Sequence, residues 1–264
     1  MNEVLLKAQK AKQASLALAH LNSQTKNDFL IALSKALIDG TDMILRANAQ
    51  DNHAATHLNA SLKDRLTLNE KRIQAIASSL IELSQAQDPV HQILSETIRP
   101  NGLKIKKISV PMGVIAMIYE ARPNVTIDAA ALAFKAGSAI VLRGGKEALN
   151  TNQALTSIIK KTLISMKLDP ESVQLIEDPD KELAKVLMTA NGLIDLLIPR
   201  GSARLIQTVM STATVPVLET GVGNCHAYVE ASADQDMAIK VLVNSKVSRP
   251  SVCNALEKVL IVQT

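Results

Sequence analysis

The sequence predicts an α/β protein, with a mostly parallel, doubly wound sheet preceded by an N-terminal helical region. Three observations predict this fold class. The chain has 264 residues, 47% of them hydrophobic, which is enough for a large core. Aromatic residues make up only 2%, so the core must consist of Leu, Ile, Val, Ala and Met, as suits helices on a buried parallel sheet. After residue 100, short apolar runs alternate with helical patterns at distances that fit βαβ units.

The first 100 residues are expected to form a helical region that packs on this core. Apolar residues recur at helical spacing from Phe29 to Ile38, in a segment that Thr25 could cap and Gly40 could end or bend. A further helix is expected from Glu70 to Gln87. The region shows no catalytic constellation, so we expect the chemistry to lie downstream.

After the turn at Pro100-Asn101-Gly102, strands and helices are expected to alternate. The expected strands are 104–109, 114–119, 139–142, 173–176, 193–198, 215–218 and 258–262. The expected helices are 126–135, 146–166, one opened by Asp178 and Pro179, 202–210 and 234–245. In such sheets, ligands bind beyond the carboxyl ends of the strands.

Composition and charge exclude several kinds of partner. The formal net charge of +4 is spread along the chain, and its densest cluster, Lys104, Lys106 and Lys107, suits either a solvated strand face or an anion patch. The scarcity of aromatic residues gives no stacking platform for a nucleic acid. No stretch resembles a signal peptide or a membrane span. We therefore expect neither nucleic-acid nor membrane binding.

The cysteine count indicates the compartment. Cys225 and Cys253 are too few for a disulfide framework and indicate a reducing, cytoplasmic location. Cys225 and His226 form no metal-ligand cluster, so both are expected to be structural and no metal is expected.

Four loops that follow expected strands are rich in Gly or small polar residues: 120–124, 143–146, 199–202 and 219–224. Glycines let the backbone approach a ligand, and a helix N-terminus beyond them offers N–H groups to a phosphate. None of the loops matches GxGxxG or the P-loop, and each by itself could be an ordinary turn. Four such loops at one edge of a sheet favour a ligand site.

Cys253 stands in a polar segment, Arg249-Pro250-Ser251-Val252-Cys253-Asn254. A single cysteine can be a small buried apolar residue. It can also be a nucleophile, whose thiolate Arg249 could stabilise. The residues alone leave both interpretations open.

Together these segments resemble the gamma-glutamyl phosphate reductase (glutamate-5-semialdehyde dehydrogenase) family of the aldehyde dehydrogenase superfamily. The matching segments, in the family's order, are 110–124, 136–139, 142–148, 198–201, 219–226 and 249–255. The helical N-terminal region also fits, so the resemblance covers essentially the whole chain. It implies an aldehyde-dehydrogenase-like, Rossmann-type sheet. It also implies three parts: a helical region at 1–100, an NADP-binding domain at 101–247, and the start of the catalytic domain at 248–264.

The resemblance implies NADPH-dependent reduction of L-glutamyl 5-phosphate to L-glutamate 5-semialdehyde with release of phosphate, a step of proline biosynthesis. Cys253 would attack the acyl carbon and form a thioester. The Asn124 amide and the Cys253 backbone N–H would stabilise the oxyanion. Glu219 resembles the superfamily's general base and would manage the thiol proton, although a loop carboxylate that caps a turn is an open alternative.

The resemblance also implies an NADP(H) site. Arg143 and Lys146 follow the strand where the superfamily binds the adenosine ribose, and a basic side chain there favours the 2′-phosphate of NADP, although a merely solvated Lys remains open. Gly201 and Ser202 resemble the turn that approaches the pyrophosphate. The expected cofactor-binding residues are Arg143, Gly144, Gly145, Lys146, Gly201, Ser202 and Gly221.

Family members continue well beyond the nucleophile, whereas only residues 254–264 follow it here. We therefore expect the catalytic domain, with much of the substrate pocket and of the dimer contact, to be largely missing. A full-length form is expected to be a homo-oligomer with a functional link to glutamate 5-kinase. Two alternatives stay open: a non-catalytic NADP-binding fragment, and a generic NAD(P)-dependent aldehyde dehydrogenase.

Overall fold

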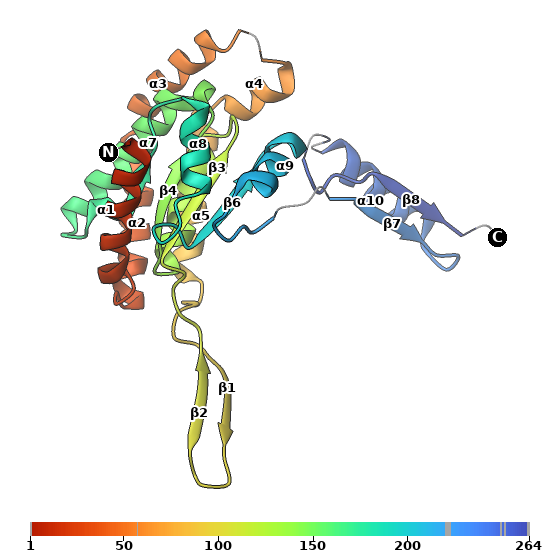
Figure 1. Cartoon of the computed structure of the whole chain (residues 1–264). Helices are drawn as coiled ribbons and strands as arrows, with labels where there is room; N and C mark the ends of the chain where they lie inside the picture. Colours follow the sequence, from red (N-terminus) through yellow and green to blue (C-terminus); the bar gives the residue numbers. More distant parts are fainter. Residues whose placement is uncertain (1, 57, 220–222, 249, 251, 263–264) are drawn as a thin grey trace. The chain divides into compact units, whose positions relative to one another are not determined.

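The computed structural model describes residues 2–56, 58–219, 223–248, 250 and 252–262. It divides into two compact units, Met1–Glu219 and Thr220–Thr264. The predicted fold class is confirmed: helices come first and a parallel sheet follows (Figure 1). The predicted functional division at residues 100 and 247 stays a prediction.

Five helices form the N-terminal region of unit 1: α1 Glu3–Leu18, α2 Ser23–Asp39, α3 Thr41–Ala54, α4 Ala60–Leu66 and α5 Glu70–Gln85. Gly40 separates α2 from α3, as expected. Thr25 is not the cap of α2. Its N–H donates to the Asn22 side chain at 2.8 Å, because α2 already begins at Ser23.

The central sheet of unit 1 has four parallel strands in the order β5-β4-β3-β6. They are β3 Val114–Tyr119, β4 Ala139–Arg143, β5 Val173–Leu175 and β6 Leu196–Arg200. Helices α6 Asn124–Lys135 and α7 Leu149–Ser165 pack on one face, and α1 and α8 Lys181–Met188 on the other. Unit 1 also contains the 3-10 turns η1 Lys146–Ala148 and η2 Pro170–Ser172, and helix α9 Ala203–Thr212. The sheet is therefore covered on both faces, which explains its apolar strands.

The strand order places a switch point in the middle of this sheet. From β3 the chain moves outward through β4 and β5, and it then returns to form β6 on the other side of β3. The connections after β3 and β6 consequently diverge at the carboxyl ends of these two strands. Ligands of doubly wound sheets bind at such a switch point.

Three expectations about unit 1 are wrong. The segment 104–109 does not belong to the parallel sheet, because β2 Lys104–Ile108 pairs antiparallel with an unexpected strand, β1 Ile93–Ile98. The segment 215–218 is not a strand and makes one parallel bridge, Leu197 to Val217. Helix α8 begins after Asp180, whose side chain accepts from the Glu182 N–H at 3.0 Å, and not at Asp178-Pro179.

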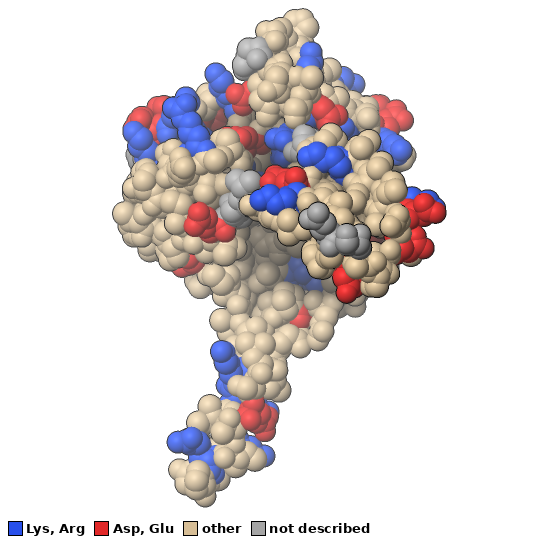
Figure 2. Space-filling model, turned by 90° about the vertical axis from the view of Figure 1, so that its right-hand side faces the viewer, with Lys and Arg blue, Asp and Glu red and all other residues tan. Residues whose placement is uncertain are grey.

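The β1–β2 hairpin is exposed along its whole length. It extends away from the helices and the sheet of unit 1 (Figure 1). Its basic side chains face solvent (Figure 2), and Lys106 pairs with Glu96 across the strands at 3.3 Å. The solvated strand face, one of the two interpretations of the lysine cluster, agrees with this exposure.

Unit 2 contains β7 His226–Val229, α10 Gln235–Val247 and β8 Lys258–Ile261. Strands β7 and β8 pair in parallel, and Asp234 caps α10, where the sequence predicted the helix to begin. Strand β7 was not expected from the sequence. None of the described helices, in either unit, is long and apolar enough to cross a membrane.

Candidate functional site

Three of the four predicted loops lie at one edge of the central sheet. Because β3, β4 and β6 are parallel neighbours, the loops 120–124, 143–146 and 199–202 all leave the sheet at its carboxyl edge. The segment 215–218, which precedes the fourth loop, runs alongside β6, where the Leu218 N–H donates to the Leu197 carbonyl at 2.9 Å. Glu219 follows it, exposed, at the end of unit 1.

The Glu120 carboxylate closes the switch point between β3 and β6. One of its oxygens accepts the Ser202 N–H at 2.8 Å, and the other accepts the Ser202 hydroxyl at 2.7 Å. Gly201 lies close to this carboxylate: a Cβ there would lie 2.6 Å from the Glu120 Cδ, so a larger residue would displace the Glu120 side chain. The carboxylate thus occupies the N-terminus of α9, a position that favours negative charge.

The loop after β4 packs tightly on a buried polar chain. The Tyr119 hydroxyl bonds the Thr126 hydroxyl at 2.7 Å, and Thr126 donates to Asn152 at 2.9 Å. Burial raises the pKa of Tyr119, so its hydroxyl stays protonated. A Cβ at Gly144 would collide with the Asn152 amide and lie 3.2 Å from the Tyr119 ring. The glycine therefore keeps the loop flat against the sheet edge.

The two basic residues of this loop differ in their surroundings. The Arg143 guanidinium donates to the carbonyls of Pro179 at 3.2 Å and Asp180 at 2.8 Å, and it thereby ties β4 to the segment before α8. Burial lowers the pKa of Arg143, although Asp180 and Asp178 oppose the effect. Lys146, at the start of η1, is exposed. Lys146 is therefore better placed than Arg143 to meet a ligand phosphate.

Asn124 begins α6 directly after the β3 loop. Its amide donates to the Asp128 carboxylate, one turn further along the helix, at 2.9 Å. Burial raises the pKa of Asp128, and the Asn124 amide partly counters it. The amide is thus held in one orientation by a carboxylate that lies largely out of solvent.

Cys253 lies in unit 2, where it is exposed and forms no disulfide. The Cys225 thiol donates to the Cys253 carbonyl at 3.4 Å. Gly223 lies against the same carbonyl, with which a Cβ there would collide. The backbone carbonyl of Cys225 accepts from the N–H groups of Glu257 at 3.0 Å and Lys258 at 3.1 Å. Two segments far apart in the sequence thereby fix the backbone at Cys253.

The three predicted catalytic residues are divided between the units. Asn124 and Glu219 belong to unit 1 and Cys253 belongs to unit 2. Gly221 lies outside the described residues, as does Arg249, which was expected to stabilise the Cys253 thiolate. In the described parts of the chain, no group of three or more His, Cys, Asp or Glu side chains could hold a metal ion.

Sequence reasoning missed three residues that shape this site. Glu120 was treated only as part of a loop. Its position directly after a buried strand could have indicated a functional carboxylate at the carboxyl edge of the sheet. Asp128 stands four residues after Asn124, a spacing that places both on one helix face. Gly223 belongs to a Gly-rich loop whose contact with Cys253 is not visible in the sequence.

Comparison with known proteins agrees with this architecture. Residues 2–264 match the model of the aldehyde dehydrogenase family. Gamma-glutamyl phosphate reductase of Caldanaerobacter subterraneus subsp. tengcongensis is 52% identical, with 98% of this chain and 63% of the relative covered. The protein of that name from Moorella thermoacetica is 50% identical, with 98% and 62% covered. The crystal structure of gamma-glutamyl phosphate reductase from Thermotoga maritima is 40% identical, with a TM-score of 0.92 and with 99% and 64% covered.

The predicted resemblance to gamma-glutamyl phosphate reductases is thus confirmed. The chain spans about 63% of the length of the curated relatives it matches. The family match, in contrast, extends over nearly all of the residues present, from the helical region through the sheet to the Cys253 segment. The chain therefore belongs to the aldehyde dehydrogenase family.

Proposed function

We propose that the chain carries the NADP-binding core and the nucleophile of a gamma-glutamyl phosphate reductase. That enzyme would reduce L-glutamyl 5-phosphate to L-glutamate 5-semialdehyde and release phosphate. The observation that carries the proposal is the similarity, at 50% and 52% identity over 98% of this chain, to proteins with that name. The Cys253 segment lies within the matched length.

The carboxyl edge of the central sheet suits a dinucleotide. Gly144 and Gly145 let the loop after β4 pack closely on its neighbours, and Lys146 offers an exposed ammonium to a 2′-phosphate. Gly201 and Ser202 present the N-terminus of α9 to the pyrophosphate. Because the Glu120 carboxylate holds Ser202, cofactor binding requires this carboxylate to move or to share Ser202 with the phosphate. Bound NADPH would supply a hydride.

Cys253 is the proposed nucleophile. Its thiolate attacks the acyl carbon of the substrate, the carbon–oxygen bond to phosphate breaks, and a thioester with Cys253 remains. When the thioester is reduced, the carbon–sulfur bond breaks and the thiolate is restored. The Cys225 thiol and Gly223 contact the Cys253 carbonyl. The Cys253 N–H would donate to the oxyanion that forms in both steps.

Asn124 and Glu219 would complete the chemistry from unit 1. The Asn124 amide donates to the oxyanion, and Asp128 limits its rotation beforehand. Glu219 takes the thiol proton, since the reductive direction requires no water attack. Arg143 has a supporting role, because its guanidinium is engaged with the carbonyls of Pro179 and Asp180.

The reverse reaction tests this proposal. With the full-length form, L-glutamate 5-semialdehyde and NADP⁺, we expect NADPH formation that requires inorganic phosphate and disappears in Cys253→Ala, while NADP binding by this variant persists. NADP binding without turnover would contradict the reductase and support a non-catalytic binding module. Phosphate-independent oxidation of simple aldehydes would instead support a generic aldehyde dehydrogenase.

The partners are proposed on the same basis. An acyl phosphate substrate must come from a kinase that phosphorylates the side-chain carboxylate of glutamate. This is the basis for a link to glutamate 5-kinase, and for a cytoplasmic location shared with that kinase. The homo-oligomer is supported by the apolar side chains that the β1–β2 hairpin exposes, among them Ile93, Leu94 and Ile98. Sedimentation analysis of the full-length form tests it, because a monomer would contradict it.

A further inference from the structure

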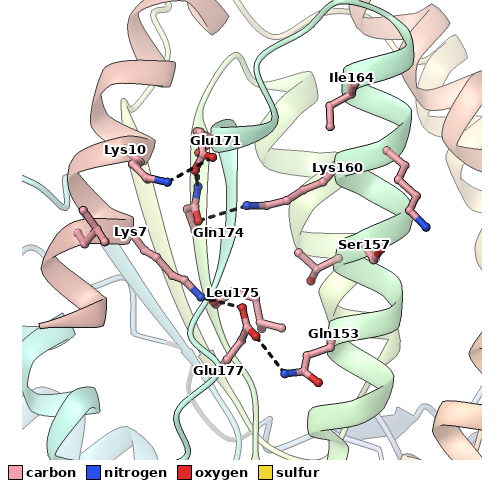
Figure 3. A pocket seen from close by; sticks show the side chains of 13 residues that line it. Lys7, Lys10, Gln153, Ser157, Lys160, Ile164, Glu171, Gln174, Leu175 and Glu177 are labelled. Atoms are coloured by element: carbon pink, nitrogen blue, oxygen red, sulfur yellow. Dashed lines mark hydrogen bonds and ion pairs between the residues drawn. The ribbon is translucent and has the colours of Figure 1, made fainter.

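A cavity of unit 1 is lined by none of the residues of the proposed cofactor site. It has a volume of about 590 Å³ and lies between α1, α7 and β5 (Figure 3). Four lysines and two glutamates line it: Lys7, Lys10, Lys160, Lys161, Glu171 and Glu177. The positive groups thus outnumber the negative ones, so the cavity favours an anion.

The two glutamates are already engaged. Lys7, from α1, lies 2.9 Å from the Glu177 carboxylate, and Lys10 lies 3.5 Å from Glu171. On the opposite wall, Lys160 extends from α7 across the cavity toward Gln174 of β5 (Figure 3). Its Nζ donates at 3.4 Å to the neutral amide oxygen of this residue. The Lys160 charge therefore faces the cavity without a paired carboxylate among the described contacts.

Burial acts on this lysine. It lowers the pKa of Lys160; the more distant carboxylates of Glu171 and Glu177 only partly oppose the effect, and Lys7 and Lys10 add to it. An ammonium that has lost part of its hydration and gained no ion pair would be stabilised by a bound anion.

Thr156 supplies an independent observation. It lines the cavity one turn before Lys160, and only 6% of its surface is exposed. Its hydroxyl has no hydrogen-bond partner in the described structure. Buried polar atoms are nearly always paired, so an unpaired hydroxyl in a cavity that Lys160 also lines indicates a missing acceptor. An oxygen-rich anion would satisfy both groups.

We propose that the cavity between α1, α7 and β5 binds a small oxyanion, a phosphoryl or carboxylate group, through the Lys160 ammonium and the Thr156 hydroxyl. The apolar side chains of Leu6, Ile164 and Leu175 line the same cavity and would contact the carbon skeleton of a larger ligand. This site does not depend on the proposed reductase activity.

Calorimetric titration of the 264-residue chain tests the site, with inorganic phosphate and acetate as separate probes at matched ionic strength. We expect saturable binding of at least one probe, and the probe that binds identifies the phosphoryl or the carboxylate class. Lys160→Met should weaken this binding about tenfold or more, because a charge-assisted hydrogen bond is lost. Thr156→Val should weaken it too, yet leave thermal stability without ligand unchanged or higher, because Val fills the space without a buried hydroxyl.

Two matched variants separate this site from other sources of binding. Lys35→Met removes the same charge from an exposed position of α2 and should bind like the unmodified chain. Ser202→Ala alters the proposed pyrophosphate turn and should also keep the binding, whereas NADP affinity should fall. The absence of saturable binding by both probes would overturn the site. Lys160→Met and Lys35→Met variants that lose affinity for the probe equally would also overturn it. So would a Ser202→Ala variant that loses this affinity while Lys160→Met keeps it.

Discussion

Strands β4 and β8 are similar in composition and differ in burial. Strand β4, Ala-Ile-Val-Leu-Arg, has four of its five residues buried in the central sheet of unit 1. Strand β8, Lys-Val-Leu-Ile, is exposed along its whole length in unit 2. The β1–β2 hairpin resembles β8, since its isoleucines and leucines also face solvent.

The difference lies in the neighbours of each strand. Strand β4 is paired on both sides and covered by helices on both faces. Strands β7 and β8 pair with each other, as do β1 and β2, and two-stranded sheets are marginally stable alone. We infer that the free energy of folding is concentrated in the central sheet of unit 1, and that the paired strands outside it contribute little.

The largest expected effect concerns the core of the central sheet. Leu142→Ala removes a side chain that is fully buried in β4, so it should destabilise the chain by about 3–5 kcal/mol. Leu260→Ala in β8, where the side chain is 49% exposed, should cost less than about 1 kcal/mol. Urea unfolding followed by circular dichroism measures both. Similar decreases in the free energy of unfolding would show that β8 is packed as tightly as β4.

A smaller effect is expected for two ion pairs. Lys26, 1% exposed, lies 2.6 Å from Asp88, and Lys26→Met should cost about 3 kcal/mol because the carboxylate loses its main partner. The Lys106–Glu96 pair on the hairpin is exposed, so Lys106→Met should cost less than about 1 kcal/mol. Thermal denaturation at neutral pH compares the two. A Lys26→Met variant as stable as the unmodified chain would show that the Lys26–Asp88 pair does not stabilise the fold.

The smallest expected effect is a pH dependence. Burial alone would raise the pKa of Asp88. Hydrogen bonds from Lys26, the Val90 N–H and Ser23 lower it by more than burial raises it, so the pKa lies below the ordinary 3.8. A lowered pKa stabilises the fold above the unfolded-state pKa, and this contribution is lost as the pH falls through the folded value. The stability difference between the unmodified chain and Asp88→Asn should therefore shrink below about pH 4.

Glu96→Gln on the hairpin is the matched control, because it removes a carboxylate from an exposed pair. A stability gap for Asp88→Asn that stays constant between neutral and acidic pH would show that the Asp88 charge does not act in the folded state.

The sequence predicted the parts of the fold that rest on local patterns. The strand 114–119 was predicted at its observed bounds, and the helix predicted from residue 234 is α10, which Asp234 caps. The strand 104–109 was assigned to the wrong sheet, because its partner β1 lies across a turn and no pattern within β2 distinguishes antiparallel from parallel pairing. Strand β7 was missed, because its four residues are half exposed and show no apolar run.

The candidate site was predictable to a similar extent. Loop composition identified the carboxyl edge of the sheet, including the glycine at 144 and the turn at 201 and 202. It could not show that Glu120 holds Ser202, since that contact joins residues 82 positions apart. Nor could it show that the guanidinium of Arg143 is held by backbone carbonyls, whereas Lys146 is exposed.

The most direct test of the central claim is detection of an acyl group on Cys253. The full-length form is incubated with L-glutamate 5-semialdehyde and NADP⁺ without phosphate, and its peptides are analysed by mass spectrometry. We expect a glutamyl thioester on Cys253 and not on Cys225, discharged when inorganic phosphate is added. No acylation, acylation of Cys225 instead, or discharge at the same rate by water alone would contradict the assignment of Cys253 as the nucleophile of a phosphate-releasing reductase.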